Sequence, residues 1–165
     1  MELRPLKLLF NQTAEDMFPW INLVMVSWCL LLFAPYWSLT PNLTLIAPLL
    51  LSVVYVGTVF SLVLWPQPNN DSPADFTSLQ GVVDMFQDPT AVFAGWVHFV
   101  VFDALVGRMI VLDAISRGST LKFHIFGVIP CLLFTFLLGP TGFLGYMILR
   151  EIFLPTKDTS KLKIL

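Results

Sequence analysis

Four side chains capable of acid–base or ionic chemistry recur at intervals of five residues within one apolar segment. They are His98, Asp103, Arg108 and Asp113. A charged group at the middle of a lipid bilayer costs about 2.5–3.5 kcal/mol, and such groups persist when they are paired, hydrated or used in function. Asp103 lies nearest the middle of the segment, so it is the strongest functional candidate in the chain.

The segment is predicted to be a helix on which these four side chains do not share one face. At about 100° per residue, His98, Asp103, Arg108 and Asp113 point to about 0°, 140°, 280° and 60°. A helix that is polar on several sides must be largely enclosed, so we expect it at the centre of a bundle. Trp96 lies within about 20° of Asp103 and about two turns away, so the pair could line a pocket with an aromatic wall and a carboxylate.

Each of these residues also has a purely structural interpretation. Asp103 could pair with a base or an amide from another helix, and Arg108 could extend toward the loop that follows its own helix. Asp113 is near the membrane edge, where a solvated or capping role is common. His98 could bind a metal or haem, but a lone histidine more often bonds a neighbour. His124 is expected near the opposite membrane surface, which disfavours a haem between the two histidines.

The composition indicates that much of the chain is surrounded by lipid. Of the 165 residues, 56% are hydrophobic and 12% are charged, and the mean hydropathy is +0.79. Soluble domains carry about 25% charged residues. No Asp, Glu, Lys or Arg occurs between residues 17 and 70, and a soluble core of this size could not bury such a stretch. The sequence therefore predicts an all-α, multi-pass membrane protein.

Several other classes of protein are excluded by the same composition. A net charge of −2 and the lack of a basic patch argue against nucleic-acid binding. Cys29 and Cys131 lie in apolar runs and form neither a zinc nor a disulfide pattern. The sequence shows no phosphate-binding loop, no cluster of metal ligands and no haem, flavin or nicotinamide motif. We therefore predict neither a metal nor a cofactor.

Four segments are long enough to cross a bilayer, which takes about 20 apolar residues. They are residues 18–37, 43–65, 91–116 and 126–149. We expect them to form an antiparallel bundle within one membrane domain, residues 1–165, with a basic polar tail over residues 151–165. Trp20, Trp37 and Trp65 fall where interfacial aromatic residues belong. Asp88 followed by Pro89 predicts the start of the third helix.

The loop between the second and third spans is acidic and contains a short amphipathic pattern. Its apolar residues are Phe76, Leu79, Val82, Val83 and Phe86. The spacing predicts a helix that lies on the membrane surface, or one that packs as a lid over the bundle. Counting Lys and Arg near the spans gives six on the side of the two termini and two on the other. The positive-inside rule then favours cytoplasmic or stromal termini.

The fourth segment contains a proline between glycines. Pro140 removes a helical hydrogen bond and clashes with the preceding turn, and Gly139 and Gly142 flank it. We expect the helix to kink or open here. Carbonyl groups freed at this depth need partners or a water-filled cavity, although an ordinary proline kink remains the alternative.

Taken in order, these features resemble one family. They are Leu79-x-Gly81-x-x-x-Met85-Phe86, Trp96-x-His98, then Asp103, Arg108 and Asp113, then Cys131-Leu132-Leu133-Phe134 and Pro140-x-Gly142. Residues 79–150 are similar to the abscisic-acid-deficient-4-like family of plastid membrane proteins, which are required to make neoxanthin from violaxanthin. The resemblance implies a four-helix protein of pigment-containing membranes such as the thylakoid.

The chemistry that the resemblance implies is an isomerisation in which a carotenoid epoxide opens to an allene and a hydroxyl group. It needs an acid at the epoxide oxygen and a base at the polyene. We assign Asp103 as the base and Arg108 or His98 as its acidic or electrostatic partner. Trp96, Asp113, Pro140 and Gly142 are the expected substrate-binding residues. The implied partners are membrane lipid and a carotenoid or other isoprenoid, with other membrane proteins or further copies of the chain left open.

Two further interpretations stay open. The chain could be a non-catalytic carotenoid-binding or assembly factor of photosynthetic membranes. It could also be a small transporter, although only one span carries ionisable residues near its middle and no inverted repeat is evident. Plastid members have a transit peptide, whereas this N-terminus shows no Ser- and Arg-rich segment. We therefore expect a cyanobacterial or other bacterial member, or a mature plastid form.

Overall fold

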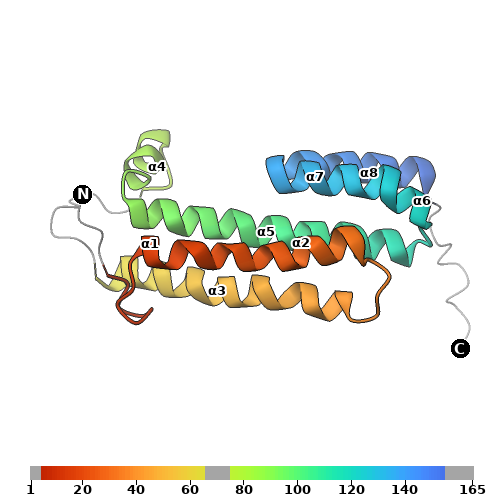
Figure 1. Ribbon diagram of the computed structural model, residues 1–165. Helices are drawn as coiled ribbons and strands as arrows, with labels where there is room; N and C mark the ends of the chain where they lie inside the picture. Colours follow the sequence, from red (N-terminus) through yellow and green to blue (C-terminus); the bar gives the residue numbers. More distant parts are fainter. Residues whose placement is uncertain (1–4, 66–74, 155–165) are drawn as a thin grey trace, which may run out of the picture. The chain divides into compact units, whose positions relative to one another are not determined.

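A computed structural model describes residues 5–65 and 75–154, and every regular element in these ranges is helical (Figure 1). In chain order the helices are α1 (Ala14–Met17), η1 (Phe18–Leu23), α2 (Val24–Phe33), α3 (Thr40–Leu64), α4 (Leu79–Met85), α5 (Pro89–Ser116), α6 (Leu121–Phe123), η2 (His124–Val128), α7 (Ile129–Leu138) and α8 (Pro140–Phe153). The β pairing of the described part is one isolated bridge between Leu6 and Gln12. The predicted all-α class is confirmed.

Within residues 5–65 and 75–154, three helical stretches are long and apolar enough to cross a membrane. They are Ala14–Phe33, Thr40–Leu64 and Leu121–Leu138. The first two correspond to the first two predicted spans, displaced by a few residues toward the N-terminus. The predicted third span is α5, which has 28 residues and therefore a length of about 42 Å at 1.5 Å per residue. These helices are those of a membrane protein.

The first helical stretch begins at a capping box. The Thr13 hydroxyl accepts a hydrogen bond from the backbone N–H of Asp16, and the Asp16 carboxylate accepts one from the backbone N–H of Thr13. Two otherwise unpaired groups are satisfied in this way. The helix then continues through η1 and α2 without interruption to Phe33, so the helix starts earlier than the sequence analysis placed the span.

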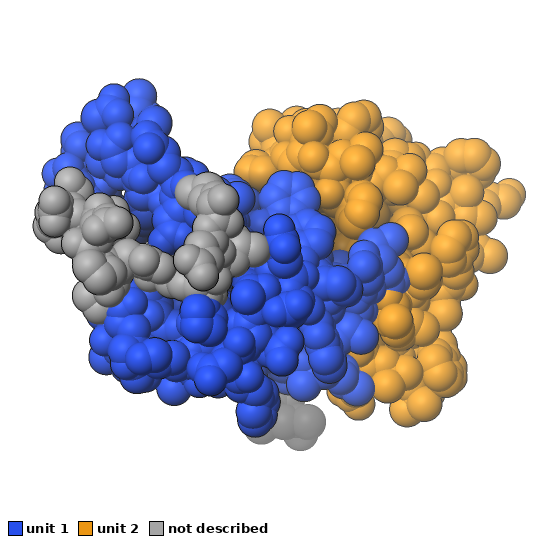
Figure 2. All heavy atoms as spheres, turned by 60° about the vertical axis from the view of Figure 1, so that its left-hand side comes forward, with its two compact units in different colours: residues 1–25, 46–102 blue, residues 26–45, 103–165 orange. Residues whose placement is uncertain are grey.

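The chain divides into two compact units, shown in different colours in Figure 2. Unit 1 comprises residues 1–25 and 46–102, and unit 2 comprises residues 26–45 and 103–165. In unit 1 a short N-terminal turn packs on α3, where the Leu9 side chain occupies the space that a Cβ at Gly57 would need. The Lys7 ammonium lies 5.1 Å from the Trp65 ring centre, a cation–π contact.

Unit 1 also contains α4, the amphipathic helix predicted in the acidic loop. Ser78 caps it by accepting a hydrogen bond from the backbone N–H of Gly81. None of its residues is buried, and Leu79 is 82% exposed. Phe86, which follows the helix, lies against Gly95 of α5. The predicted helix is present, and whether it lies on the membrane surface stays a prediction.

In unit 2 the end of α5 leads into a tight turn. Gly118 has φ +80°, and the backbone N–H of Ser119 bonds to the carbonyl of Ala114, which is the Schellman arrangement at the end of a helix. Thr120 then caps α6 through a bond from the backbone N–H of Phe123. One turn of π-helix, η2, connects α6 to α7.

The fourth predicted span, residues 126–149, is not one continuous helix. Helix α7 ends at Leu138, Gly139 has φ +49°, and α8 begins at Pro140 and runs back along α7. The reversal is visible in Figure 1, where α7 and α8 lie side by side. At its end the Phe153 ring lies 6.3 Å from that of Phe123. The expected kink is therefore a complete turn.

The residue types at this turn explain the reversal. Glycine adopts a positive φ without the steric penalty that other residues meet. Proline lacks the N–H that would continue α7, and its fixed φ suits the first position of a new helix. Gly142 then allows the two helices to touch, because an added Cβ would overlap the Cys131 carbonyl oxygen and the backbone nitrogen of Thr135.

Candidate functional site

Asp103, the strongest candidate from the sequence, lies at the middle of α5 beside the turn between α7 and α8. A Cβ added at Gly139 would stand 3.0 Å from its Oδ1 atom. The side chain is partly exposed. Within residues 5–65 and 75–154 its carboxylate has no hydrogen-bond or ion-pair partner. Asp103 is therefore a carboxylate without a structural partner in the described part of the chain, next to a backbone turn.

Arg108 has a partner, and it is a backbone group. Its Nε and Nη2 atoms donate hydrogen bonds of 3.1 and 3.0 Å to the carbonyl oxygen of Pro41, in the first turn of α3. The guanidinium therefore joins α5 to α3 within unit 2. The sequence analysis had left open an extension toward the loop after α5, and the structure places the group on α3 instead.

Asp113 is the centre of an ionic cluster, and its side chain is 28% exposed. Its Oδ2 atom accepts a 2.6 Å hydrogen bond from the Tyr146 hydroxyl and a 3.1 Å bond from Arg117 Nε, and it lies 3.6 Å from Arg150 Nη1. Tyr146 is 1% exposed. Because Tyr146 and Arg150 belong to α8, this carboxylate joins the end of α5 to the returning helix.

Trp96 and His98 belong to unit 1. Trp96 is 52% exposed. The His98 ring is exposed and lies among aromatic rings, with its centre 5.5 Å from that of Tyr55 and 4.6 Å from that of Phe102. The other histidine, His124, is buried in unit 2, where its Nε2 lies 3.3 Å from the Leu32 carbonyl oxygen.

Pro140 and Gly142, expected at a substrate pocket, form a helix contact instead. Pro140 is the first residue of α8, and Gly142 is buried against the backbone of α7. No space for a ligand exists at the Cβ position of Gly142. Their role in the structure is to close the hairpin, and the substrate-binding assignment of Pro140 and Gly142 stays a prediction.

The sequence analysis gave no site role to three members of the ionic cluster or to Gly139, which lies beside Asp103. Arg117 follows Asp113 by four residues, the spacing at which helical side chains meet, so this pair was detectable. Tyr146 and Arg150 reach Asp113 only because α8 folds back, and Gly139 reaches Asp103 for the same reason. No group of three or more His, Cys, Asp or Glu residues that could hold a metal occurs in the described ranges.

Taken together, the fold and these residues define a class of small all-helical membrane proteins with acidic and basic side chains within a long helix. A family model described as ABA DEFICIENT 4-like matches residues 17–146 of the chain. The chain therefore belongs to the ABA DEFICIENT 4-like family, and the match begins 62 residues before Leu79, where the resemblance began. No curated protein and no solved structure matches the chain.

Proposed function

We propose that the protein is a membrane-embedded isomerase of carotenoid epoxides, which opens the epoxide of violaxanthin to the allene of neoxanthin. The observation that carries the proposal is the carboxylate of Asp103, which is partly exposed at the middle of α5 and has no partner among the described residues. A group kept unpaired at this depth is costly unless it is used. Family membership supports the choice of a carotenoid substrate.

In this proposal Asp103 removes a proton from the polyene carbon next to the epoxide. The electron pair of that C–H bond forms the second double bond of the allene, and the epoxide C–O bond breaks. The released oxygen takes up a proton and becomes a hydroxyl group. The product is therefore an isomer of the substrate, and no electron acceptor or donor is needed. An aspartate can act as such a base when it is held within hydrogen-bond reach of the proton.

The remaining sequence candidates contribute differently. The Arg108 guanidinium already bonds to the Pro41 carbonyl, so we assign it to holding α5 against α3. His98 has aromatic neighbours and an exposed ring, and it stays a candidate for the acid that protonates the oxygen. A protein with this activity would work in a pigment-containing membrane such as the thylakoid.

A second candidate function is a carotenoid-binding or assembly factor without catalysis. Trp96, Phe99 and Phe102 of α5 are all more than half exposed, and aromatic side chains on a lipid-facing helix suit contact with a polyene. This function needs an apolar surface but no proton transfer. It therefore predicts that pigment stays bound when Asp103 loses its charge and that no product forms in either case.

The experiment is to incubate the detergent-purified protein with violaxanthin and separate the products by chromatography. Asp103→Asn is the test variant. Asp84→Asn is the matched control, since Asp84 is an exposed aspartate of α4 whose partners are glutamine side chains. We expect the allenic product with the wild type and with Asp84→Asn, and at least a hundredfold slower formation with Asp103→Asn, as is typical of losing a general base.

The outcomes separate the two functions. Equal turnover by Asp103→Asn would refute the catalytic assignment. Bound violaxanthin without product from the wild type would instead establish the binding or assembly function. A His98→Ala variant, measured in the same assay, tests the acid, and an unchanged rate would remove His98 from the mechanism.

A further inference from the structure

Two guanidinium groups converge on one carboxylate oxygen at the end of unit 2 where α5 finishes. Arg117 Nε lies 3.1 Å and Arg150 Nη1 lies 3.6 Å from Asp113 Oδ2. Arg117 directly follows α5, whereas Arg150 comes from the last turn of α8. The hairpin therefore brings together two positive charges that are 33 residues apart in the sequence. Both groups contact Asp113 Oδ2, which also accepts the bond from the Tyr146 hydroxyl, and Arg117 Nε bonds to Oδ1 as well at 3.2 Å.

One donor in this cluster has no acceptor. The Nη1 atom of Arg117 is buried, and no described residue accepts a hydrogen bond from it. Buried donors are nearly always satisfied by protein, water or an ion, so an exception needs an explanation. Glu151 is not an acceptor for this atom, because it bonds to Nε and Nη2 of Arg150 and its side chain is 58% exposed. Exposed ion pairs of this kind contribute little to the stability of the fold.

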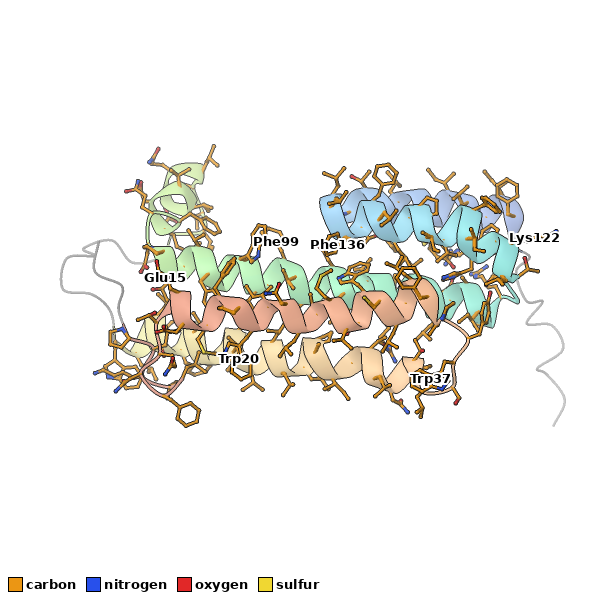
Figure 3. The ribbon with its side chains drawn as sticks, viewed as in Figure 1. Glu15, Trp20, Trp37, Phe99, Lys122 and Phe136 are labelled. Carbon is orange, nitrogen blue, oxygen red and sulfur yellow. The ribbon has the colours of Figure 1, made fainter. Side chains whose placement is uncertain are left out.

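The cluster is accessible from the surface. The side chains of Arg117 and Arg150 are 18% and 19% exposed to solvent. Lys122, which lies at the start of the hairpin in Figure 3, adds a third base at this end of the unit. Because α5 ends at Ser116 and long basic side chains near the ends of membrane helices extend toward the headgroups, we expect these groups at the depth of the lipid headgroups.

We propose that Arg117 and Arg150 together bind an oxyanion of the phosphate class, and that the phosphate is that of an anionic phospholipid headgroup. A guanidinium fork matches the geometry of phosphate oxygens with two parallel hydrogen bonds. The unpaired Nη1 of Arg117 supplies one donor once rotation of the side chain exposes it, and the Arg150 nitrogens released from Glu151 supply the others. Binding requires the closed hairpin, because only then do α5 and α8 present both side chains to the same ligand.

This requirement gives a direct assay. Cys131 lies in α7 and is buried, whereas Cys29 is exposed, so in a Cys29→Ala background the labelling of Cys131 by a thiol reagent reports opening of the hairpin. A ligand that binds only the closed form slows labelling by a factor of one plus the ratio of its concentration to Kd, about tenfold at ten times Kd. The probes are phosphatidylglycerol, a galactolipid with the same acyl chains, and inorganic phosphate.

We expect phosphatidylglycerol to slow the labelling with saturation and the galactolipid to leave it unchanged. Arg150→Gln and Arg117→Lys should abolish the protection, because the first removes one fork and the second removes Nη1 while keeping the charge. Lys122→Gln is the matched control, since it removes the neighbouring exposed base while leaving both arginine forks in place, and it should keep the protection.

Other results would overturn the proposal. Equal protection by the galactolipid, or protection that survives both arginine substitutions, would refute a phosphate site. Protection by inorganic phosphate alone, at the same occupancy, would support the oxyanion site and refute the lipid as its source. If an arginine variant does not fold, native mass spectrometry of the wild type in a mixture of both lipids decides. Retention of phosphatidylglycerol over galactolipid supports the site, and equal retention refutes it.

Discussion

Replacing Gly142 by alanine should open the α7–α8 hairpin. An added Cβ would overlap the Cys131 carbonyl oxygen and the Thr135 backbone nitrogen, and these backbone atoms cannot rotate away as a side chain could. Overpacking costs about 1–3 kcal/mol, and rigid neighbours place this site at the upper end, about 3 kcal/mol. Alanine regains about 1 kcal/mol of helix propensity over glycine. The net cost is about 2 kcal/mol, which raises the opening equilibrium roughly thirtyfold.

The rate at which Cys131 reacts with a thiol reagent measures this opening. The experiment uses the Cys29→Ala background in detergent, with a reagent concentration low enough that labelling follows the equilibrium population of the open form. Gly145→Ala is the matched control, one turn along α8. Its added Cβ would stand 3.8 Å from Cys131 Sγ, an ordinary contact. We expect Gly145→Ala to label at or below the wild-type rate.

The reasoning fails if Gly142→Ala and Gly145→Ala label at the same rate. That result would mean that α7 and α8 do not touch at Gly142, and the reversal at Gly139 would lose its main support. Circular dichroism of each variant provides the necessary check, because helix content should stay unchanged when the hairpin opens without unfolding.

Three further predictions follow from contacts within single units. Arg108→Gln should lower the unfolding free energy by about 1.5–3 kcal/mol in denaturant titrations, because it removes charged donors from the Pro41 carbonyl; an unchanged midpoint would contradict the contact. Gly118→Ala should cost about 1 kcal/mol and Gly118→Asn clearly less, since alanine is strained at φ +80° whereas asparagine tolerates it; equal midpoints would argue against that conformation. Hydrogen bonds from Thr77 and Ser78 lower the pKa of Asp75 from 3.8 to about 2, so its stabilisation of the turn before α4 is complete above pH 4 and lost as the pH falls through 2. Amide exchange in α4 should speed up over that window in the wild type and show no such step in Asp75→Asn.

The helical class and the approximate spans were predictable because they depend on local composition. An uncharged run as long as residues 17–70 is stable in a bilayer as membrane-spanning helices, so the first two helices could be predicted from it. The start of α5 was also predictable, since Asp88 Oδ1 accepts a 2.8 Å hydrogen bond from the backbone N–H of Thr90 and Pro89 takes the first helical position. These features need no information about distant residues.

The hairpin was not predictable from its own residues. A Gly–Pro pair in a long apolar run is compatible with a kink and with a full turn, and the choice depends on whether α8 finds a surface to pack on. Gly142 provides it by meeting the backbone of α7. Some site contacts form only when the hairpin closes, so they could not be predicted from the sequence either. They are the contacts of Tyr146 and Arg150 with Asp113 and that of Gly139 with Asp103.

The hairpin also changes the sidedness of the chain. Within unit 2 the end of α8 lies beside Phe123, and Tyr36 bonds to the carbonyl of Ser119, so residues 121–153 leave from the end at which they entered. Placing both termini on one side of the membrane assumed that residues 126–149 cross it once as a single helix, and a segment that folds back on itself does not have that form. Arg117 after α5, Lys122 in α6 and Arg150 in the last turn of α8 are thereby gathered at that one end of unit 2, although the sequence separates them by up to 33 residues.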